Sequence, residues 1–179
     1  FMARRQIPPR FADLRRTLSL VATAVDRGER AVFGRGDLAH VRVPRAVCAA
    51  SAAPVLFAPV RIEERDFIDA GMGDVAHADL AAEKGCELVL IINPMVPVRA
   101  DVGEQGVPTG HGPGRRVRDK GLLWVSSQAW RLRSNQRLRD GLSRHREARR
   151  DCELILLEPD PDDATMFMYS PMNFAARRT

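Results

Sequence analysis

Two short, uninterrupted runs of aliphatic residues constrain the fold of this 179-residue chain more than any other feature. They lie within residues 87–93 and 153–157. A strand that is buried on both faces has a continuous apolar run of this kind, and such strands are typical of parallel sheets covered by helices. Both runs are far shorter than the roughly 18 apolar residues that a membrane helix requires. The sequence therefore predicts two buried strands of a parallel sheet and no membrane span.

The rest of the chain alternates between strand and helix patterns. Two further short strands, a glycine-rich turn and a helix that Gly85 caps precede the first aliphatic run, which is the order expected in a parallel α/β sheet. We therefore predict an α/β fold, a three-layer sandwich with a mostly parallel central sheet. The other expected elements are a hairpin (18–25 and 31–33), a helix opened by Pro44 (45–52), two short strands (60–62 and 65–69), the helix before Gly85 (76–84), a long surface loop (98–118) and a long helix (121–150).

Composition places the chain among soluble globular proteins, with 45% hydrophobic and 28% charged residues. The three cysteines are widely separated and form no C-x-x-C pair, which fits reduced thiols buried in a cytosolic fold. The four histidines lack the spacing of a zinc site. We expect no metal and no cofactor.

The turn that begins at Asp69 is the strongest candidate for chemistry. It places a carboxylate at the carboxyl end of a predicted strand, beside the small residues Ala70, Gly71 and Gly73. Ligands of open α/β sheets gather at the carboxyl ends of strands, so a catalytic acid or base suits the position. Aspartate is also common in turns because it bonds to nearby backbone, and spacing alone favours that structural role.

The second candidate is a basic segment, residues 115–150, which holds twelve Arg or Lys against three acidic residues. Such a segment binds anionic phospholipid headgroups or nucleic-acid phosphates, or is simply a solvated helix face. Trp124 and Trp130 lie close to the helix start, and no nucleic-acid-binding motif accompanies them. Nucleic acid is therefore not favoured as a partner.

Several motifs occur in a specific order along the chain. They are L-S-L-V-A-T-A-V-D-R-G (18–28), V-P-R-A-V-C-A-A-S-A-A-P-V-L-F (43–57), F-I-D-A-G (67–71), L-V-L-I-I-N-P-M-V (88–96), and the segments 153–159 and 169–178. In this order they resemble the patatin-like phospholipases, lipid acyl hydrolases that use a Ser-Asp dyad. The resemblance implies that Asp69 is the catalytic aspartate, supported by its turn residues Ala70, Gly71 and Gly73.

Two departures from the family pattern matter. The family carries Asp-Gly-[Gly/Ala], whereas Ala70 and Gly71 stand here in the reverse order. If the residue after the aspartate requires a positive φ, alanine costs about 1 kcal/mol or more relative to glycine. The nucleophile motif G-x-S-x-G occurs nowhere in the chain. Ser51 falls in a stretch that is not the family's nucleophile and is interpreted as a packing residue. His77 is interpreted as a helix-surface or helix-start residue, since the dyad uses no histidine.

The resemblance thus implies that residues 1–179 form the C-terminal part of a single patatin-like domain, incomplete at its N-terminal side. We predict a lipid acyl hydrolase acting on phospholipids or other acyl-ester lipids, of which this chain supplies the base and is inactive alone. Expected partners are the missing N-terminal half or a second copy of the chain, with peripheral membrane contact and a cytoplasmic location. The alternative is a non-catalytic module that binds anionic lipid or nucleic acid through residues 115–150.

Overall fold

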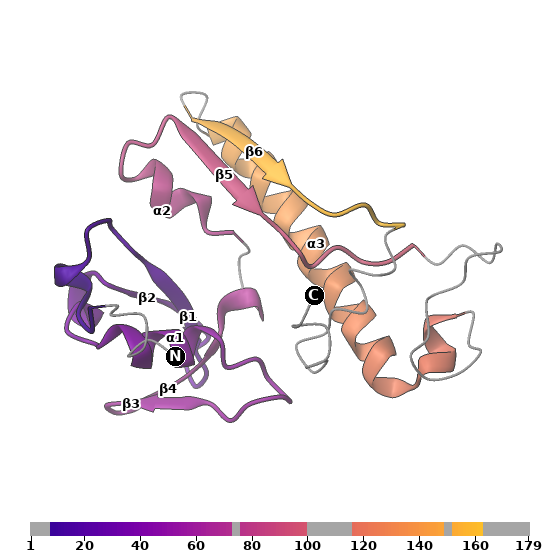
Figure 1. Cartoon of the computed structure of the whole chain (residues 1–179), viewed down its shortest axis with the longest axis horizontal. Coiled ribbons are helices and arrows are strands. Elements are labelled where there is room, and N and C mark those ends of the chain that lie inside the picture. The colour runs from indigo at the N-terminus through magenta and orange to yellow at the C-terminus, as the bar shows by residue number, and fades with distance from the viewer. Residues whose placement is uncertain (1–7, 73–75, 100–115, 149–151, 163–179) are drawn as a thin grey trace. The chain divides into compact units, whose positions relative to one another are not determined.

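A computed structural model of the chain describes residues 8–72, 76–99, 116–148 and 152–162 (Figure 1). The chain divides into two compact units, Phe1–Gly73 and Asp74–Thr179. Each unit has a sheet and a hydrophobic core of its own. The units are described one at a time.

The first unit is built on a four-stranded sheet with the order β2-β1-β4-β3. Every neighbouring pair of these strands is antiparallel. The strands are β1 (Leu20–Ala24), β2 (Glu29–Phe33), β3 (Val60–Ile62) and β4 (Arg65–Asp69). Tight turns join β1 to β2 and β3 to β4, and a tight turn can connect only antiparallel neighbours, because a parallel pair needs a long crossover. The expected hairpin and the two short strands are confirmed.

Helix α1 (Val43–Ala50) packs on this sheet. Pro44 lies in its first turn, where a missing N–H removes no helical hydrogen bond. Ala46 and Ala49 are fully buried, and their small side chains allow the helix to approach the strands closely. The rings of Phe33 and Phe67 meet edge to face with centroids 5.4 Å apart at the centre of this core. The described part of this unit also contains three short 3-10 helices: Phe11–Asp13, Gly36–Leu38 and η4 (Ala70–Met72).

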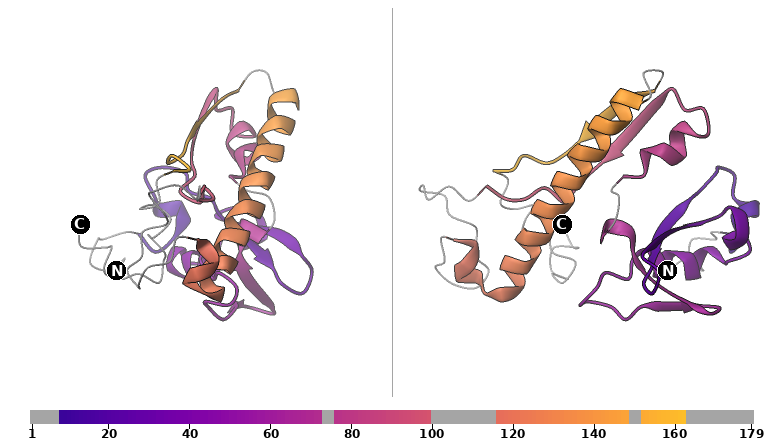
Figure 2. Two further views of the ribbon diagram at one scale, coloured as in Figure 1. Left: turned by 90° about the vertical axis from the view of Figure 1, so that its right-hand side faces the viewer. Right: turned by 180° about the vertical axis from the view of Figure 1, so that it is seen from behind.

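The second unit contains a parallel pair of strands, β5 (Leu88–Ile92) and β6 (Glu153–Leu157). The long helix α3 (Leu122–Ala148) lies between them in sequence and runs along the pair in space (Figures 1 and 2). This is the long helical crossover that parallel strands require. A short helix, α2 (Ala78–Ala82), precedes β5, and a 3-10 turn, η5 (Val117–Lys120), precedes α3.

The core of the second unit lies on one face of the β5–β6 pair. Ile91 and Leu154 pack there against Leu138 and Leu142 of α3. The prediction that both strands are buried on both faces is wrong. The opposite face is open in this structure, where Leu88 and Leu90 are each 55% exposed and Ile92 is 71% exposed. Burial of both faces requires a second covering layer, which the described residues do not provide.

The expected fold class is therefore only partly confirmed. The chain is a mixed α/β structure with one antiparallel and one small parallel sheet, and it is not a clear three-layer parallel sandwich. The aliphatic runs predicted the parallel pair correctly. They gave no information on the strands of the first unit, whose direction depends on their tight turns.

Most helix predictions agree with the structure, and several details differ. The helix before Gly85 covers fewer residues than expected, and Gly85 has the positive φ of a helix C-cap (+76°). Cys152 is buried as predicted, but Cys48 and Cys86 are exposed. Within the described segments, no helix is long and apolar enough to cross a bilayer. Most of the predicted loop 98–118 lies outside the described residues.

Candidate functional site

Asp69 is the last residue of β4, an inner strand of the first unit's sheet. Its Cα pairs with Ala22 of β1, and its amide N–H donates a hydrogen bond to the carbonyl oxygen of Ala52 over 3.0 Å. The backbone of Asp69 is thus held both by the neighbouring strand and by the segment that follows α1. The Cα that carries the carboxylate is therefore held in a fixed position, as a catalytic group requires.

The side chain of Asp69 is half-buried and turns back toward the next residues. The amide N–H of Gly71 donates a hydrogen bond to its Oδ1 over 2.6 Å. This is the local bond, two residues apart, by which aspartate organises turns. A bond to an ionised acceptor is among the stronger hydrogen bonds in proteins. Among the described residues, this hydrogen bond engages Oδ1 of the carboxylate.

The turn accommodates the reversed order of Ala70 and Gly71 without backbone strain. Both residues belong to η4, and neither has a positive φ. The penalty anticipated for alanine after the aspartate therefore does not arise, and Ala70 is buried instead. Gly71 lies close to the carboxylate: a Cβ there would be 3.0 Å from Oδ1 of Asp69, so the carboxylate would have to shift by a few tenths of an ångström. Gly73, the other predicted turn residue, lies outside the described residues.

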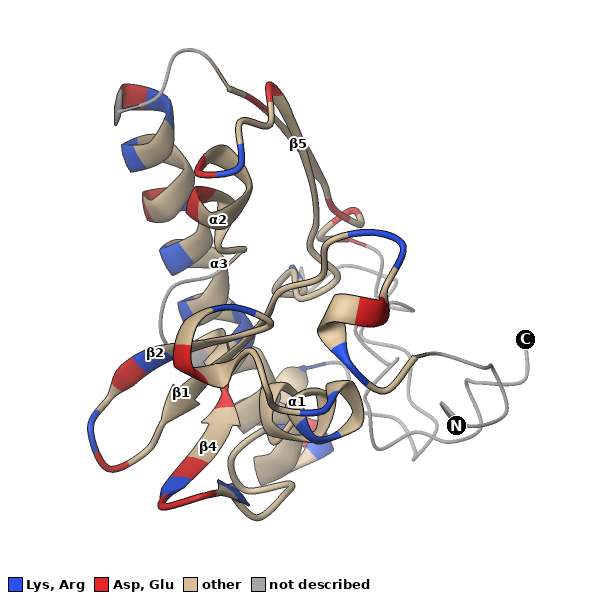
Figure 3. Ribbon diagram, turned by 90° about the vertical axis from the view of Figure 1, so that its left-hand side faces the viewer, with Lys and Arg blue, Asp and Glu red and all other residues tan. Residues whose placement is uncertain are grey.

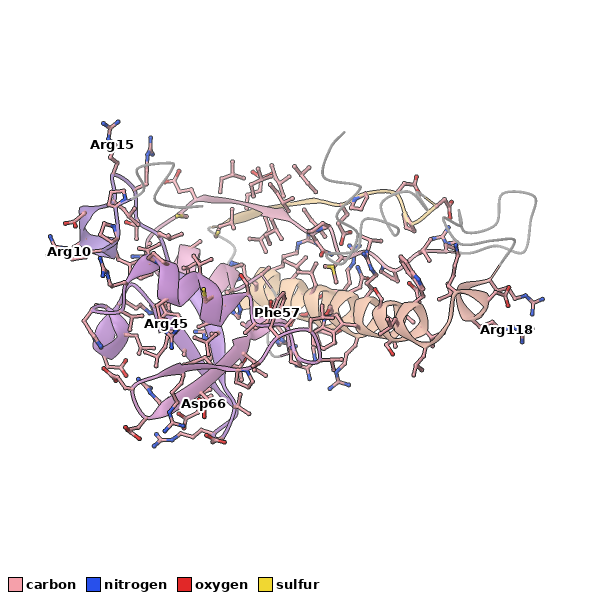
Figure 4. The ribbon with its side chains drawn as sticks, turned by 60° about the horizontal axis from the view of Figure 1, so that its bottom comes forward. Arg10, Arg15, Arg45, Phe57, Asp66 and Arg118 are labelled. Carbon is pink, nitrogen blue, oxygen red and sulfur yellow. The ribbon has the colours of Figure 1, made fainter. Side chains whose placement is uncertain are left out.

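The loop between α1 and β3 presents apolar side chains that the motif analysis did not single out. Val55 is 96% exposed, and Phe57, which Figure 4 labels, is 59% exposed. Val55 also has a φ of 73°, a conformation that β-branched residues rarely adopt. This loop begins directly after Ala52, the backbone partner of Asp69. The available signal was a stretch of fifteen residues without a charge, 46–60, in a chain with 28% charged residues.

The two other side chains that the sequence analysis weighed, Ser51 and His77, belong to different units. Ser51 is exposed at the C-terminal end of α1, so its interpretation as a packing residue is wrong. Its amide N–H bonds to the carbonyl of Val47 and ends the helix. His77 is the N-cap residue of α2, in the second unit, as expected for a helix-start histidine.

The basic segment is only partly a solvated surface. Lys and Arg recur along α3 (Figure 3), but Arg131 is only 3% exposed. One of its terminal nitrogens donates to the carbonyl oxygens of Pro94 (3.3 Å) and Val96 (3.0 Å). Desolvation lowers the pKa of Arg131. This arginine therefore holds the chain after β5 against the helix and is not accessible to a ligand.

A second arginine of α3 also makes contacts within the protein. Arg139 forms an ion pair with Glu158, which follows β6. Asn93 donates to the same carboxylate over 2.7 Å. An open cleft of about 460 Å³ lies beside this group and is lined in part by Val96, Leu132 and Arg139. Residues 115 and 149–150 of the basic segment lie outside the described residues.

Comparison with known proteins identifies the first part of the chain. Residues 2–82 match the family model of the patatin-like phospholipases. The match includes Asp69 and its turn, the whole described part of the first unit, and α2. No curated protein matches the chain at a significant level. The motifs noted beyond residue 82 fall outside the matched segment. On this evidence, residues 2–82 are similar to the patatin-like phospholipase family.

Proposed function

We propose that this chain supplies the base of a patatin-type lipid acyl hydrolase and that Asp69 is that base. The observation that carries the proposal is the position of Asp69 at the end of β4, with Oδ1 held by Gly71, inside the segment that matches the family. The family match supports a lipid acyl hydrolase. The role of Asp69 and the bond that is cleaved are parts of the proposal.

The proposed reaction is a two-step acyl transfer to water. A serine Oγ attacks the ester carbonyl carbon while a carboxylate oxygen of Asp69 takes the serine proton. The tetrahedral intermediate then collapses, the carbon–oxygen bond to the alcohol breaks, and the alcohol oxygen receives the proton from Asp69. Water attacks the resulting acyl-serine by the same route, and the carboxylic acid and the free serine are released.

The chain supplies only part of this machinery. It contains no G-x-S-x-G motif, so the proposal requires the serine and the donors to the oxyanion to come from residues outside these 179. In this proposal, the chain contributes the base and holds its carboxylate in a defined orientation. The bond from Gly71 fixes Oδ1, so Oδ2 is the oxygen that we assign to the serine proton. A base that is already oriented costs less reorganisation in the transition state.

The uncharged loop after α1 suits an apolar substrate. The loop follows Ala52, whose carbonyl oxygen accepts a hydrogen bond from the amide of Asp69. It exposes Val55, Leu56 and Phe57. Exposed apolar side chains next to a site are typical of ligand contacts. We therefore propose that the loop contacts the acyl chain of the ester.

The test requires a version of the protein that carries the nucleophile. We would join the residues encoded upstream of Phe1 to this chain, or add them in trans, and measure hydrolysis of a chromogenic short-chain ester. Activity that appears only with the upstream segment and disappears in Asp69→Asn supports the proposal. Serine-dependent turnover by the 179-residue chain alone, with a fluorophosphonate labelling Ser51 or another of its serines, would overturn it.

The alternative, a non-catalytic basic module, is distinguished by its response to salt. Binding to phosphate groups through residues 115–150 weakens steeply as salt concentration rises, because bound counterions are released. Hydrolysis of a neutral short-chain ester responds little. A protein that binds lipid or nucleic acid and never hydrolyses an ester, even with its upstream segment, would favour the alternative.

A further inference from the structure

Helix α3 has an unusual distribution of side chains around its axis. Its buried face begins with two polar residues, Arg131 (3% exposed) and Ser134 (9% exposed). It continues with Leu138 and Leu142. These four positions are spaced three to four residues apart and therefore share one side of the helix. They face the carbonyls after β5 and the core of the second unit.

An apolar stripe lies on the other side of the first half of α3. Its members share helical spacing and are all exposed: Leu122 (79%), Val125 (41%), Ala129 and Leu132 (55%). At 3.6 residues per turn, the stripe is centred roughly 150° from the buried face. In its first half, the helix therefore uses arginine and serine for its internal contacts and leaves the aliphatic residues of the stripe exposed. Leu123 is also exposed (71%) but lies to one side of the stripe.

Arginines flank this stripe and outnumber the one acidic residue beside it. Arg116 and Arg118 are exposed in the turn before α3, and Arg118 extends away from the start of the helix (Figure 4). Arg118 forms an exposed ion pair with Asp119 of the same turn, which a lipid phosphate would have to replace. Arg133, which is also exposed, flanks the stripe one residue after Leu132. An apolar stripe that ends in leucines and is flanked by arginines is the pattern of helices that lie in the interface of an anionic membrane.

We propose that the α3 stripe (Leu122, Val125, Ala129 and Leu132) docks on the surface of a bilayer that contains anionic lipid. The aliphatic side chains enter the boundary between headgroups and acyl chains, and Arg116, Arg118 and Arg133 contact the phosphates. The inference rests on the proposed function for its purpose, because a hydrolase of lipid esters must reach its substrate. Vesicle binding is measured without turnover, so the two proposals fail separately.

The other exposed apolar surface of the same unit lacks the charge that favours this choice. The open face of β5–β6 carries Leu88, Leu90 and Ile92, and the residue paired with Leu88 on that face is Glu153. An acidic residue disfavours an anionic surface. This face therefore provides a control with equal exposure and opposite charge, since Leu90 and Leu132 are both 55% exposed.

The test is sedimentation of the 179-residue chain with two kinds of vesicle, one of phosphatidylcholine alone and one with a third of phosphatidylglycerol. We expect partition to require phosphatidylglycerol and to fall steeply with salt. Leu122→Gln with Leu132→Gln is expected to weaken partition about tenfold or more. Arg133→Gln is expected to weaken it about fivefold, and Leu90→Gln to leave it within twofold.

Intrinsic fluorescence gives a second readout, because both tryptophans of the chain, Trp124 and Trp130, lie in α3. Their emission should shift to shorter wavelength on anionic vesicles. Circular dichroism confirms that each variant is folded, and sedimentation without lipid reports self-association. Three results would overturn the proposal: absence of binding to either vesicle, equal loss for Leu90→Gln and the stripe variant, or a stripe variant that only changes the oligomeric state.

Discussion

The amide N–H of Gly71 donates to Oδ1 of Asp69 over 2.6 Å, and a Cβ on Gly71 would lie 3.0 Å from the same oxygen. The carboxylate is therefore held by a residue at which any side chain would press against the same oxygen and displace it. Neighbouring Ala70 is buried and makes no comparable demand, since its φ is not positive. The roles of Gly71 and Ala70 can therefore be distinguished by substituting each residue.

We predict that Gly71→Ala lowers kcat of the active protein roughly 10- to 100-fold, because a displaced carboxylate no longer meets the serine. Ala70→Gly is the matched control. It should change kcat less than about threefold and cost about 0.5–1 kcal/mol of stability. Steady-state kinetics with a chromogenic ester and urea denaturation separate the two effects. Equal loss of activity in both variants would show that the turn is merely fragile.

Gly34 is predicted to be the glycine least tolerant of substitution in the first unit. It has a φ of +92°, and a Cβ there would lie 2.7 Å from the carbonyl oxygen of Leu18 and 2.8 Å from the ring of Phe11. Gly34→Ala should cost roughly 2–4 kcal/mol in free energy of unfolding. Gly28 has a similar φ (+64°) and open space around it, so Gly28→Ala should cost about 1–2 kcal/mol. Chemical denaturation measures both, and a larger cost at Gly28 would contradict the packing described around Gly34.

Val55 should be the residue at which the protein gains stability from glycine. Its φ of 73° is strained for a β-branched residue, and its side chain is 96% exposed, so little packing is lost. Glycine raises the entropy of the unfolded chain, which offsets part of the relief. We expect Val55→Gly to raise the free energy of unfolding by about 1 kcal/mol. If the loop contacts the acyl chain, the same variant should lose activity on long-chain esters more than on short ones.

We predict that substitutions on the two faces of the β5–β6 pair differ in their cost in free energy of unfolding. Leu138 is 1% exposed in the core between α3 and the strands, so Leu138→Ala should cost about 2–5 kcal/mol. Replacing Leu90, on the open face, by alanine should lower the free energy of unfolding by less than about 1 kcal/mol. Thermal or urea unfolding tests the pair. A large cost at Leu90 would show that a further layer covers this face in solution.

The sequence was informative where a local pattern determines local structure. The alternation at residues 60–62 and 65–69 predicted β3 and β4 with the observed bounds, and Asp69 was placed correctly at the end of a strand. The antiparallel hairpin of β1 and β2 was predicted, but the antiparallel direction of the first unit's sheet as a whole was not, because the parallel pattern of β5 and β6 was extended to it. The sequence pattern of one sheet does not predict strand direction in another, and here each unit has a sheet of its own.

Burial was the weakest part of the prediction, for a physical reason. Continuous aliphatic runs indicate apolar strands, but they do not say how many layers cover them, and Leu90 is exposed for that reason. Arg131 shows the opposite error. An arginine is expected in solvent, yet Arg131 is buried and donates to backbone carbonyls after β5. Its burial depends on contacts distant in sequence, which spacing along one helix cannot reveal.

The most direct test of the central claim compares Asp69→Asn with Asp66→Asn in the protein that carries the serine segment. Both residues are half-buried on β4, but Asp66 forms an ion pair with Arg61 and has no place in the proposed reaction. We predict that Asp69→Asn lowers kcat for a chromogenic short-chain ester by a thousandfold or more, as expected when a member of a catalytic dyad is lost. Asp66→Asn should retain at least about half of the activity. An unchanged esterase rate in a folded Asp69→Asn protein would contradict the account.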